Sequence, residues 1–207
     1  MTALGGARRA FTEPATLADA LTDALARPSV SPWIRDGVLV VAGAALTALA
    51  AQVSFIAPWT SVPYTLQTGS VLLVGTALGL RRGALSMALY VLAGVIGLPV
   101  YSDGASGLAR LLGITGGYLA AFILAGAVVG WLAERRWDRS PLGMVSLMAI
   151  GTLLIYAIGV PVLALVLHLD AWTAIYSGAI VFLPWDALKA AVAAGLIPLA
   201  WQLIGRS

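Results

Sequence analysis

Long apolar segments separated by short polar ones dominate the pattern along the chain. Six segments come close to the length of about 20 mainly apolar residues that a helix needs to cross a bilayer. They cover approximately residues 37–57, 63–80, 83–100, 115–133, 142–168 and 174–204. The second and third are short, which leaves room for irregular backbone, and the last two are long enough to tilt or to include an interfacial turn. We therefore predict an all-α fold, a bundle of six transmembrane helices.

The arginines are distributed asymmetrically about these six segments. Ten precede the first segment, separate the second from the third or the fourth from the fifth, or follow the sixth: Arg8, Arg9, Arg27, Arg35, Arg81, Arg82, Arg135, Arg136, Arg139 and Arg206. With six spans all ten fall on one side of the membrane, and the other side receives only Arg110. Because cytoplasmic loops are enriched in Lys and Arg, we expect both termini to be cytoplasmic.

Residues 1–32 have a different character from the rest of the chain. They contain acidic, basic and polar residues, with Leu17, Leu21 and Leu25 at helical spacing. We expect a cytoplasmic N-terminal arm, either mobile or forming a short helix on the membrane face. The six-helix membrane domain then covers residues 33–207.

Composition agrees with a membrane protein and excludes several other classes. Hydrophobic residues make up 60% of the 207 residues and charged residues only 10%, against roughly 25% charged in an ordinary soluble domain. So much apolar surface excludes a single soluble core and intrinsic disorder. The chain has no cysteine and one histidine, which excludes a disulfide scaffold and argues against a metal site built on Cys and His.

Two charged residues remain inside a predicted span after the others are assigned to loops and tails. They are Asp186 and Lys189, the only lysine, in the last segment. Positions i and i+3 lie on one face of a helix, and a charge at the centre of a membrane helix costs roughly 2.5–3.5 kcal/mol on insertion scales. The pair is either a structural ion pair, with the lysine snorkelling outward as a further option, or a ligand site. A carboxylate beside an ammonium group can bind a neutral polar group that both donates and accepts hydrogen bonds.

Other polar positions near the segment ends are weaker candidates. Residues 62–68 carry Thr65 and Gln67 between two prolines and the second span, which is typical either of a non-helical entry that lines a cavity or of an ordinary interfacial loop. Tyr118 follows a glycine-rich start of the fourth span, and Trp185 stands beside Asp186, where it can form a wall of the pocket.

Ala44 and Ala48 of the first span are four residues apart and give the helix a small-residue face. Such faces let helices pack closely. The contact is either internal or with a partner protein.

Five segments, in the right order across the spans, together resemble the BioY family. They are Val62-Pro63-Tyr64-Thr65-Leu66-Gln67-Thr68, Leu80-Arg81-Arg82-Gly83-Ala84-Leu85 with Leu89-Tyr90, Gly94-Val95-Ile96-Gly97-Leu98-Pro99-Val100-Tyr101, Gly113-Ile114-Thr115-Gly116-Gly117-Tyr118 and Pro184-Trp185-Asp186-Ala187-Leu188-Lys189. The family comprises the membrane-embedded biotin-binding subunits, or S components, of energy-coupling factor (ECF) vitamin transporters. The resemblance covers about residues 37–205 and departs at Ile114, where the family often has proline.

The resemblance implies that Asp186 and Lys189 bind the ureido ring of biotin, which has two N–H donors and one carbonyl. It also implies that the outer loop with Tyr101 and Asp103 helps to close the site. The ligand carboxylate is left to Arg110, another loop donor or water. The implied partners are a scaffold membrane protein, docking at Ala44 and Ala48, and two ATPases, because the chain itself lacks a nucleotide-binding loop.

The resulting expectation is a high-affinity biotin-binding subunit of a bacterial plasma membrane, with no cofactor, no catalytic residue and no nucleic-acid partner. The alternatives are an S component for another vitamin, an intramembrane enzyme using Asp186 and Lys189 as an acid/base pair, and a purely structural membrane subunit.

Overall fold

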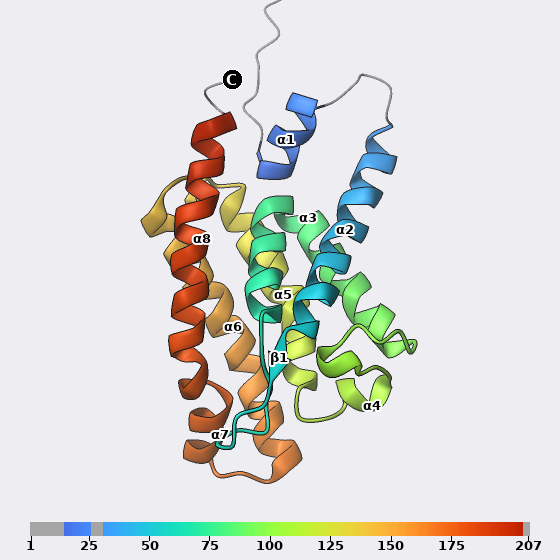
Figure 1. Cartoon of the computed structure of the whole chain (residues 1–207), viewed down its shortest axis with the longest axis vertical. Coiled ribbons are helices and arrows are strands. Elements are labelled where there is room, and N and C mark those ends of the chain that lie inside the picture. The colour runs from blue at the N-terminus through green and yellow to red at the C-terminus, as the bar shows by residue number, and fades with distance from the viewer. Residues whose placement is uncertain (1–14, 26–30, 205–207) are drawn as a thin grey trace, which may run out of the picture.

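Helices form nearly all of the structure, which confirms the predicted all-α fold (Figure 1). The computed structural model describes residues 15–25 and 31–204, and of residues 23–25 only the backbone. In chain order the helices are α1 (Leu17–Leu25), α2 (Pro32–Gln52), α3 (Gln67–Val95), α4 (Leu108–Leu111), α5 (Gly116–Ala133), α6 (Pro141–Leu167), α7 (Ala171–Gly178) and α8 (Leu183–Ile204). Three short 3-10 turns, Ser102–Gly104, Trp137–Arg139 and Ile180–Phe182, and two strands, β1 (Ser54–Phe55) and β2 (Tyr64–Thr65), complete the described part.

A sharp reversal divides α3 into two limbs at Gly79. The glycine has φ 84° and ψ 179°, a conformation that residues with a Cβ rarely adopt. A Cβ at this position would also lie 2.6 Å from Oε1 of Glu134 and 2.8 Å from Cγ2 of Thr16. The same Glu134 oxygen accepts a hydrogen bond from the backbone N–H of Leu80 at 2.8 Å, so one carboxylate stabilises the bend where the helical ladder is broken.

The two limbs of α3 run antiparallel to each other. Gln67 at the start of the first limb donates a hydrogen bond to the hydroxyl of Tyr90 near the end of the second. Closer to the bend, a Cβ on Gly83 would lie 2.9 Å from Cα of Gly75. The limbs therefore correspond to the second and third predicted spans. The count of six spans and the cytoplasmic position of the termini stay predictions.

The interior of the bundle lies around α5, which packs against α3 on one side and α6 on the other. Ala121, Ala125 and Val129 of α5 are fully buried. Backbones approach closely here, since a Cβ on Gly75 would lie 2.5 Å from the carbonyl oxygen of Gly126. Small residues thus let α3 and α5 pack with little space between them, as is typical of membrane helices.

The prediction for the first span was wrong in its boundaries. The span was expected over 37–57, but α2 begins at Pro32 and ends at Gln52. A proline in the first turn is favourable because its missing N–H is not needed there. The chain then leaves the helix, and Ser54 and Phe55 pair antiparallel with Thr65 and Tyr64. Of the two forms that the sequence left open for residues 62–68, the structure has the non-helical entry that lines a cavity.

The last predicted segment, 174–204, is interrupted in the structure. α7 ends at Gly178, a 3-10 turn follows, and α8 begins at Leu183. The carboxylate of Asp170 caps α7 by accepting from the backbone N–H groups of Trp172 and Thr173. The extra length of the segment is therefore used by a separate short helix, which places Asp186 in the first turn of α8.

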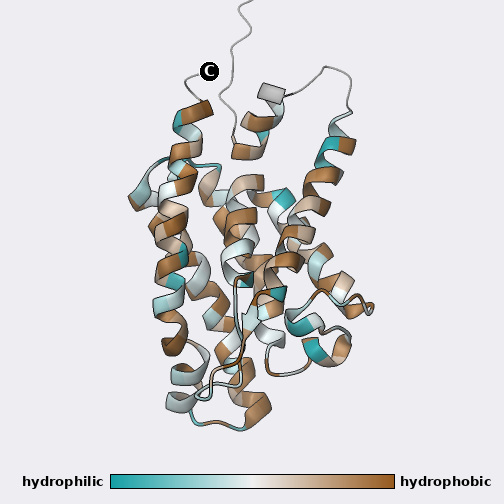
Figure 2. Cartoon of the chain, in the orientation of Figure 1, coloured by the Kyte–Doolittle hydropathy of each residue, from teal (hydrophilic) through white to brown (hydrophobic). Residues whose placement is uncertain are grey.

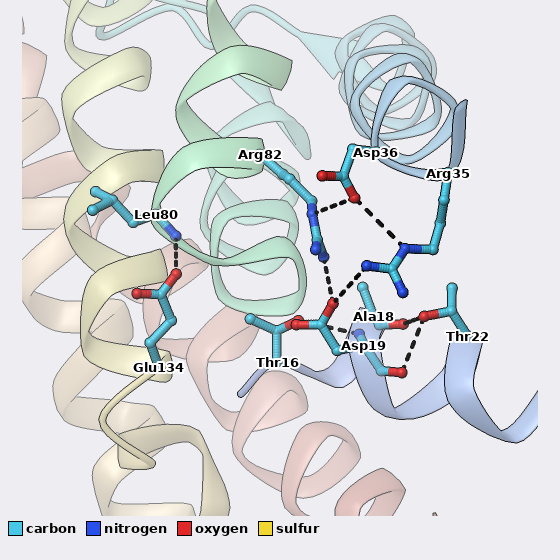
Figure 3. Close-up of polar contacts among 9 residues, drawn as sticks. All are labelled: Thr16, Ala18, Asp19, Thr22, Arg35, Asp36, Leu80, Arg82 and Glu134. Carbon is cyan, nitrogen blue, oxygen red and sulfur yellow. Dashed lines mark hydrogen bonds and ion pairs between the residues drawn. The ribbon is translucent and has the colours of Figure 1, made fainter. Parts of the chain in front are cut away.

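Several charged residues pair at the end of the bundle that holds α1 and the start of α2, which lies at the top of Figure 1 with the end of α8. We call this the arginine-rich end. Oδ1 of Asp19 in α1 accepts from Nη1 of Arg82 at 2.8 Å and lies 3.9 Å from Nη2 of Arg35. Nε of Arg82 lies 3.1 Å from Oδ1 of Asp36. Figure 3 shows how these four side chains connect α1, α2 and α3.

The N-terminal arm contributes a short helix that packs onto the bundle. Leu17 and Ala20 of α1 form a small buried cluster with Trp201 of α8. The Trp201 indole N–H also donates to the fully buried Asp138 at 2.6 Å. Burial raises the pKa of Asp138, against the effects of this hydrogen bond and of Arg139. Of the two forms expected for the arm, residues 17–25 therefore adopt the helix; residues 1–14 and 26–30 lie outside the described part.

Many large apolar side chains are exposed on the outside of the helices, and Figure 2 shows hydrophobic residues along the whole length of the long helices. Examples on α2 and α8 are Val41, Leu49, Leu188, Val192 and Leu199, each about half exposed or more. Within the described residues, five stretches are long and apolar enough to cross a membrane, with α3 counted as one and α7 with α8 as another. An apolar surface of this extent matches lipid rather than water, so the chain is a multi-pass membrane protein.

Candidate functional site

The two predicted charged residues form an ion pair at the start of α8. Nζ of Lys189 lies 2.9 Å from Oδ1 of Asp186, and each side chain is 11% exposed. α8 starts at Leu183, so both residues lie on one face of its first two turns. An acidic residue in the first turn also interacts favourably with the helix dipole.

Neutral groups from two other helices complete the surroundings of the pair. Lys189 donates a second hydrogen bond, at 2.6 Å, to the hydroxyl of Thr68 in α3. Tyr156 of α6 donates its hydroxyl hydrogen to Oδ2 of Asp186. Each charged group therefore has a neutral hydrogen-bond partner as well as the opposite charge, as buried charges require.

Two adjoining cavities open beside the pair and share the segment before α3 and its first turn. The smaller, about 300 Å³, is the ion-pair cavity, and its lining is Val62, Pro63, Thr65, Thr68, Tyr118, Tyr156, Phe182, Asp186 and Lys189. The larger, about 420 Å³, is the arginine cavity, and its lining is Val62, Pro63, Thr65, Gln67, Thr68, Tyr101, Ser102, Arg110, Thr115, Tyr118, Leu119 and Phe122. Apolar walls with a few polar groups are typical of small-molecule sites.

The arginine cavity has a distinct set of polar groups. Nη2 of Arg110 donates to the hydroxyl of Ser102 at 3.1 Å. The hydroxyl of Thr115 is buried and has no hydrogen-bond partner among the described residues. Such a group is costly unless a ligand or water satisfies it. One end of the combined space thus offers a carboxylate and an ammonium group, and the other a guanidinium and a hydroxyl.

Most of the predicted site residues come together in these cavities. Those that line them are Thr65, Gln67, Tyr101, Arg110, Tyr118, Asp186 and Lys189. Tyr101 is buried and donates to the carbonyl of Val91 at 2.7 Å, and burial raises the pKa of its hydroxyl. The amide of Gln67 is engaged with Tyr90.

Two predicted site residues take other positions. Asp103 is exposed and accepts from the hydroxyl of Ser54, so it fastens the outer loop to β1 and does not line either cavity. Trp185 stands behind the ion pair: its indole N–H donates to the carbonyl of Thr65 at 3.2 Å, and its ring centroid is 5.7 Å from Nζ of Lys189. It supports the pair and the entry segment without lining the cavity.

The small-residue face of α2 is turned into the bundle. Ala44 is 8% exposed, and Ala48 is partly buried against the same core. Between them, the hydroxyl of Thr47 lies 3.2 Å from that of Ser70 in α3. The structure thus has the internal contact that the sequence left open, and contact with a partner protein at these alanines stays a prediction.

The prediction omitted several cavity residues, of which Tyr156 is the most important. Its ring lies in the middle of an apolar span, where a hydropathy pattern counts it with its neighbours. The omitted cavity residues with polar groups are Thr68, Ser102, Thr115 and Tyr156, and the omitted aromatic ones are Phe122 and Phe182. The one usable signal for Tyr156 was a hydroxyl far from either end of its helix, which needs a partner when buried.

Comparison with known proteins connects this site to a family. The model of the BioY family matches residues 19–206. The chain is 41% identical over 137 residues to the biotin transporter BioY of Thermotoga maritima, which covers 66% of this chain and 79% of the relative. It is 37% identical over 140 residues to the biotin transporter BioY of Rhizobium etli, covering 64% and 74%.

Longer alignments and a solved structure agree with this result. The putative biotin transporter BioYB of Bacillus subtilis is 32% identical over 180 residues, 84% of this chain and 90% of the relative. The crystal structure of the S-component for biotin from an ECF-type ABC transporter has the same fold. Its TM-score is 0.75 at 21% sequence identity, covering 84% of this chain and 95% of that one.

Proposed function

The chain belongs to the BioY family, and from this premise we propose that it is a membrane subunit that binds biotin and mediates its uptake. The relatives at 32–41% identity carry the name biotin transporter. The intramembrane enzyme that the sequence left open has no such support, because the named family members are transporters and not enzymes. The same names favour biotin over another vitamin.

The observation that carries the proposal is the Asp186–Lys189 pair facing its cavity. The ureido ring of biotin has one carbonyl and two N–H groups. Lys189 can donate to the carbonyl, and Asp186 can accept from an N–H. Because both side chains are almost fully shielded from water, such charge-assisted hydrogen bonds are the strong kind.

We place the rest of the ligand in the arginine cavity. The thioether ring and aliphatic tail of biotin need apolar and aromatic walls, which Leu119 and Phe122 supply beside Tyr118. We assign the tail carboxylate to Arg110, with the unpartnered hydroxyl of Thr115 as a second donor. The two ends of the ligand then meet two chemically different ends of the space.

We further propose that transport needs a scaffold membrane protein and two ATPases, in a bacterial plasma membrane. The support is the ECF-type origin of the protein with the same fold. Docking of the scaffold at Ala44 and Ala48 requires α2 to move first, since both residues face the bundle.

Calorimetry with purified protein tests the proposal. Biotin should bind saturably, and riboflavin, thiamine and folate should not compete. The Lys189→Ala variant should bind biotin at least about 100-fold more weakly, because one charged donor is lost and Asp186 is left without its partner. A wild-type protein without saturable biotin binding would contradict the proposal, and so would a variant with unchanged affinity.

A further inference from the structure

Tyr156 occupies a special position among the residues around the ion pair. It comes from the middle of α6, its side chain is 9% exposed, and it lines the ion-pair cavity. Its hydroxyl group donates to Oδ2 of Asp186, the carboxylate oxygen that Lys189 does not contact. The carboxylate is therefore held on both oxygens, from its own helix and from α6.

Packing of the Tyr156 ring limits the positions that its hydroxyl group can take. The ring meets that of Tyr118 edge to face, with centroids 6.5 Å apart and planes at 80°. Tyr118 is fixed in turn, because its hydroxyl donates to the carbonyl of Gly178 at 2.8 Å. The Tyr156 donor is thus directed at Asp186 by packing as well as by its own hydrogen bond.

The remaining hydrogen-bonding capacity of the pair defines what a ligand can find there. An ammonium group has three donors, and Lys189 uses two, on Asp186 and Thr68. A carboxylate has about four acceptor positions, and Asp186 uses one for Lys189 and one for Tyr156. One donor and about two acceptor positions remain, which is the complement of one carbonyl and its flanking N–H groups.

We propose that Tyr156 is a positioning residue of the ligand site, and that its hydroxyl donor fixes the carboxylate of Asp186 in the orientation that accepts the ureido N–H of biotin. This inference rests on the proposed function. Without the donor, the carboxylate keeps its bond to Lys189 but can rotate about its side-chain torsion. The free acceptor positions then no longer point reliably at the ligand, and part of the binding free energy is spent on ordering them.

The first test compares biotin affinity and thermal stability in variants at this position. Tyr156→Phe keeps the ring and removes only the hydroxyl, and it should weaken biotin binding about tenfold, the usual scale for one charge-assisted hydrogen bond. Replacing Tyr156 by 4-aminophenylalanine restores a donor of similar size and should recover most of the affinity. The melting temperature of the biotin-free protein should stay close to that of the wild type in both. Tyr176→Phe is the matched control, an exposed tyrosine of α7, and should change neither quantity.

A double-mutant cycle shows whether Tyr156 acts through Asp186. Measured by competition with radiolabelled biotin on membranes, Tyr156→Phe should cost less than about twofold when Asp186→Asn is already present, because contacting residues are not additive. The inference is overturned if Tyr156→Phe binds like wild type, if the amino analogue binds as weakly as Phe, or if the loss is equal in both backgrounds. A loss of affinity matched by a lower melting temperature would show a structural role and overturn it too. Failure of the wild type to bind biotin contradicts the proposed function instead, so the two outcomes are distinguishable.

Discussion

The two ends of the bundle both contain carboxylates paired with cations, yet the pairs are built differently. At the cavity end, one Asp186–Lys189 pair is 11% exposed on each side and bonded to neutral hydroxyls, with donor and acceptor positions left over. At the arginine-rich end, Arg82 contacts both Asp19 and Asp36 and is 17% exposed, while Asp36 is 42% exposed (Figure 3). The ion pairs there link α1, α2 and α3. A ligand site therefore differs from a structural contact by its unused hydrogen-bond donor and acceptor positions beside a cavity, rather than by charge itself.

We expect the largest effect on biotin affinity from neutralising the carboxylate of the cavity pair. Asp186→Asn keeps the shape and one acceptor but removes the charge that Lys189 and the ligand share. We expect biotin affinity to fall about 100-fold, corresponding to about 2.7 kcal/mol. Isothermal titration checks this, with Asp103→Asn as the matched carboxylate outside the cavities. A loss in the control as large as that in Asp186→Asn would contradict the assignment.

A substitution at the α3 bend tests what stabilises the arginine-rich end of the bundle. Gly79→Ala introduces a Cβ at φ 84° and 2.6 Å from Glu134, and we expect it to lower the free energy of unfolding by about 2 kcal/mol. Thermal melting in detergent measures this. The control is Gly37→Ala in α2, where a Cβ meets nothing within 4 Å and helix propensity favours alanine by about 0.5–1 kcal/mol. Equal stability of the two variants would show that the bend is not strained by a side chain.

Removing the central cation of the arginine-rich end should have a smaller effect. Arg82→Gln breaks the contacts with Asp19 and Asp36, and because these pairs are partly exposed we expect a loss of only about 1 kcal/mol of stability. The loss should shrink at 1 M salt, where screening is strong. Melting curves at low and high salt measure it, and a salt-independent loss would mean that packing rather than charge is involved.

The smallest effect concerns a cap near the cavity end. Hydrogen bonding from Thr173, and then from the backbone N–H of Trp172, lowers the pKa of Asp170. A lowered folded-state pKa means that the cap stabilises the protein above the ordinary carboxyl pKa and that this contribution is lost as pH falls through the folded value. Melting temperatures of wild type and Asp170→Ala should therefore differ at neutral pH and converge in acid. A difference that persists undiminished in acid would exclude the charged cap as its cause.

The ion pair was predictable because charge is scarce in this chain. Once all eleven arginines and the other eight acids are assigned to loops and tails, Asp186 and Lys189 remain. Spacing alone placed them on one face of a helix, and the structure confirms their contact at 2.9 Å. Scarcity of charge gives no signal for Tyr156, which is neutral and lies within an apolar span. It takes the packing of α6 against α8 to bring its hydroxyl to Asp186.

Segment boundaries were less predictable than the segments themselves, because hydropathy averages over backbone geometry. The charges Arg35 and Asp36 argued for a late start of the first span, while Pro32 actually begins α2. The sequence between α7 and α8 is as apolar as a helix, and only Gly178 and Pro184 hinted at the break. The expectation for the outer loop was wrong at Asp103. This residue was expected at the site, but its carboxylate accepts a hydrogen bond from Ser54 and lies outside the cavities.

A biotin titration of two variants, one from each end of the bundle, tests most directly whether the Asp186–Lys189 pair is the ligand site. In Lys189→Gln and Arg82→Gln a neutral amide replaces a cation that is paired with aspartate. We expect biotin affinity to be at least about 100-fold weaker in Lys189→Gln and to stay within about twofold of wild type in Arg82→Gln. Equal affinities in the two variants, or a larger loss in Arg82→Gln, would contradict this expectation.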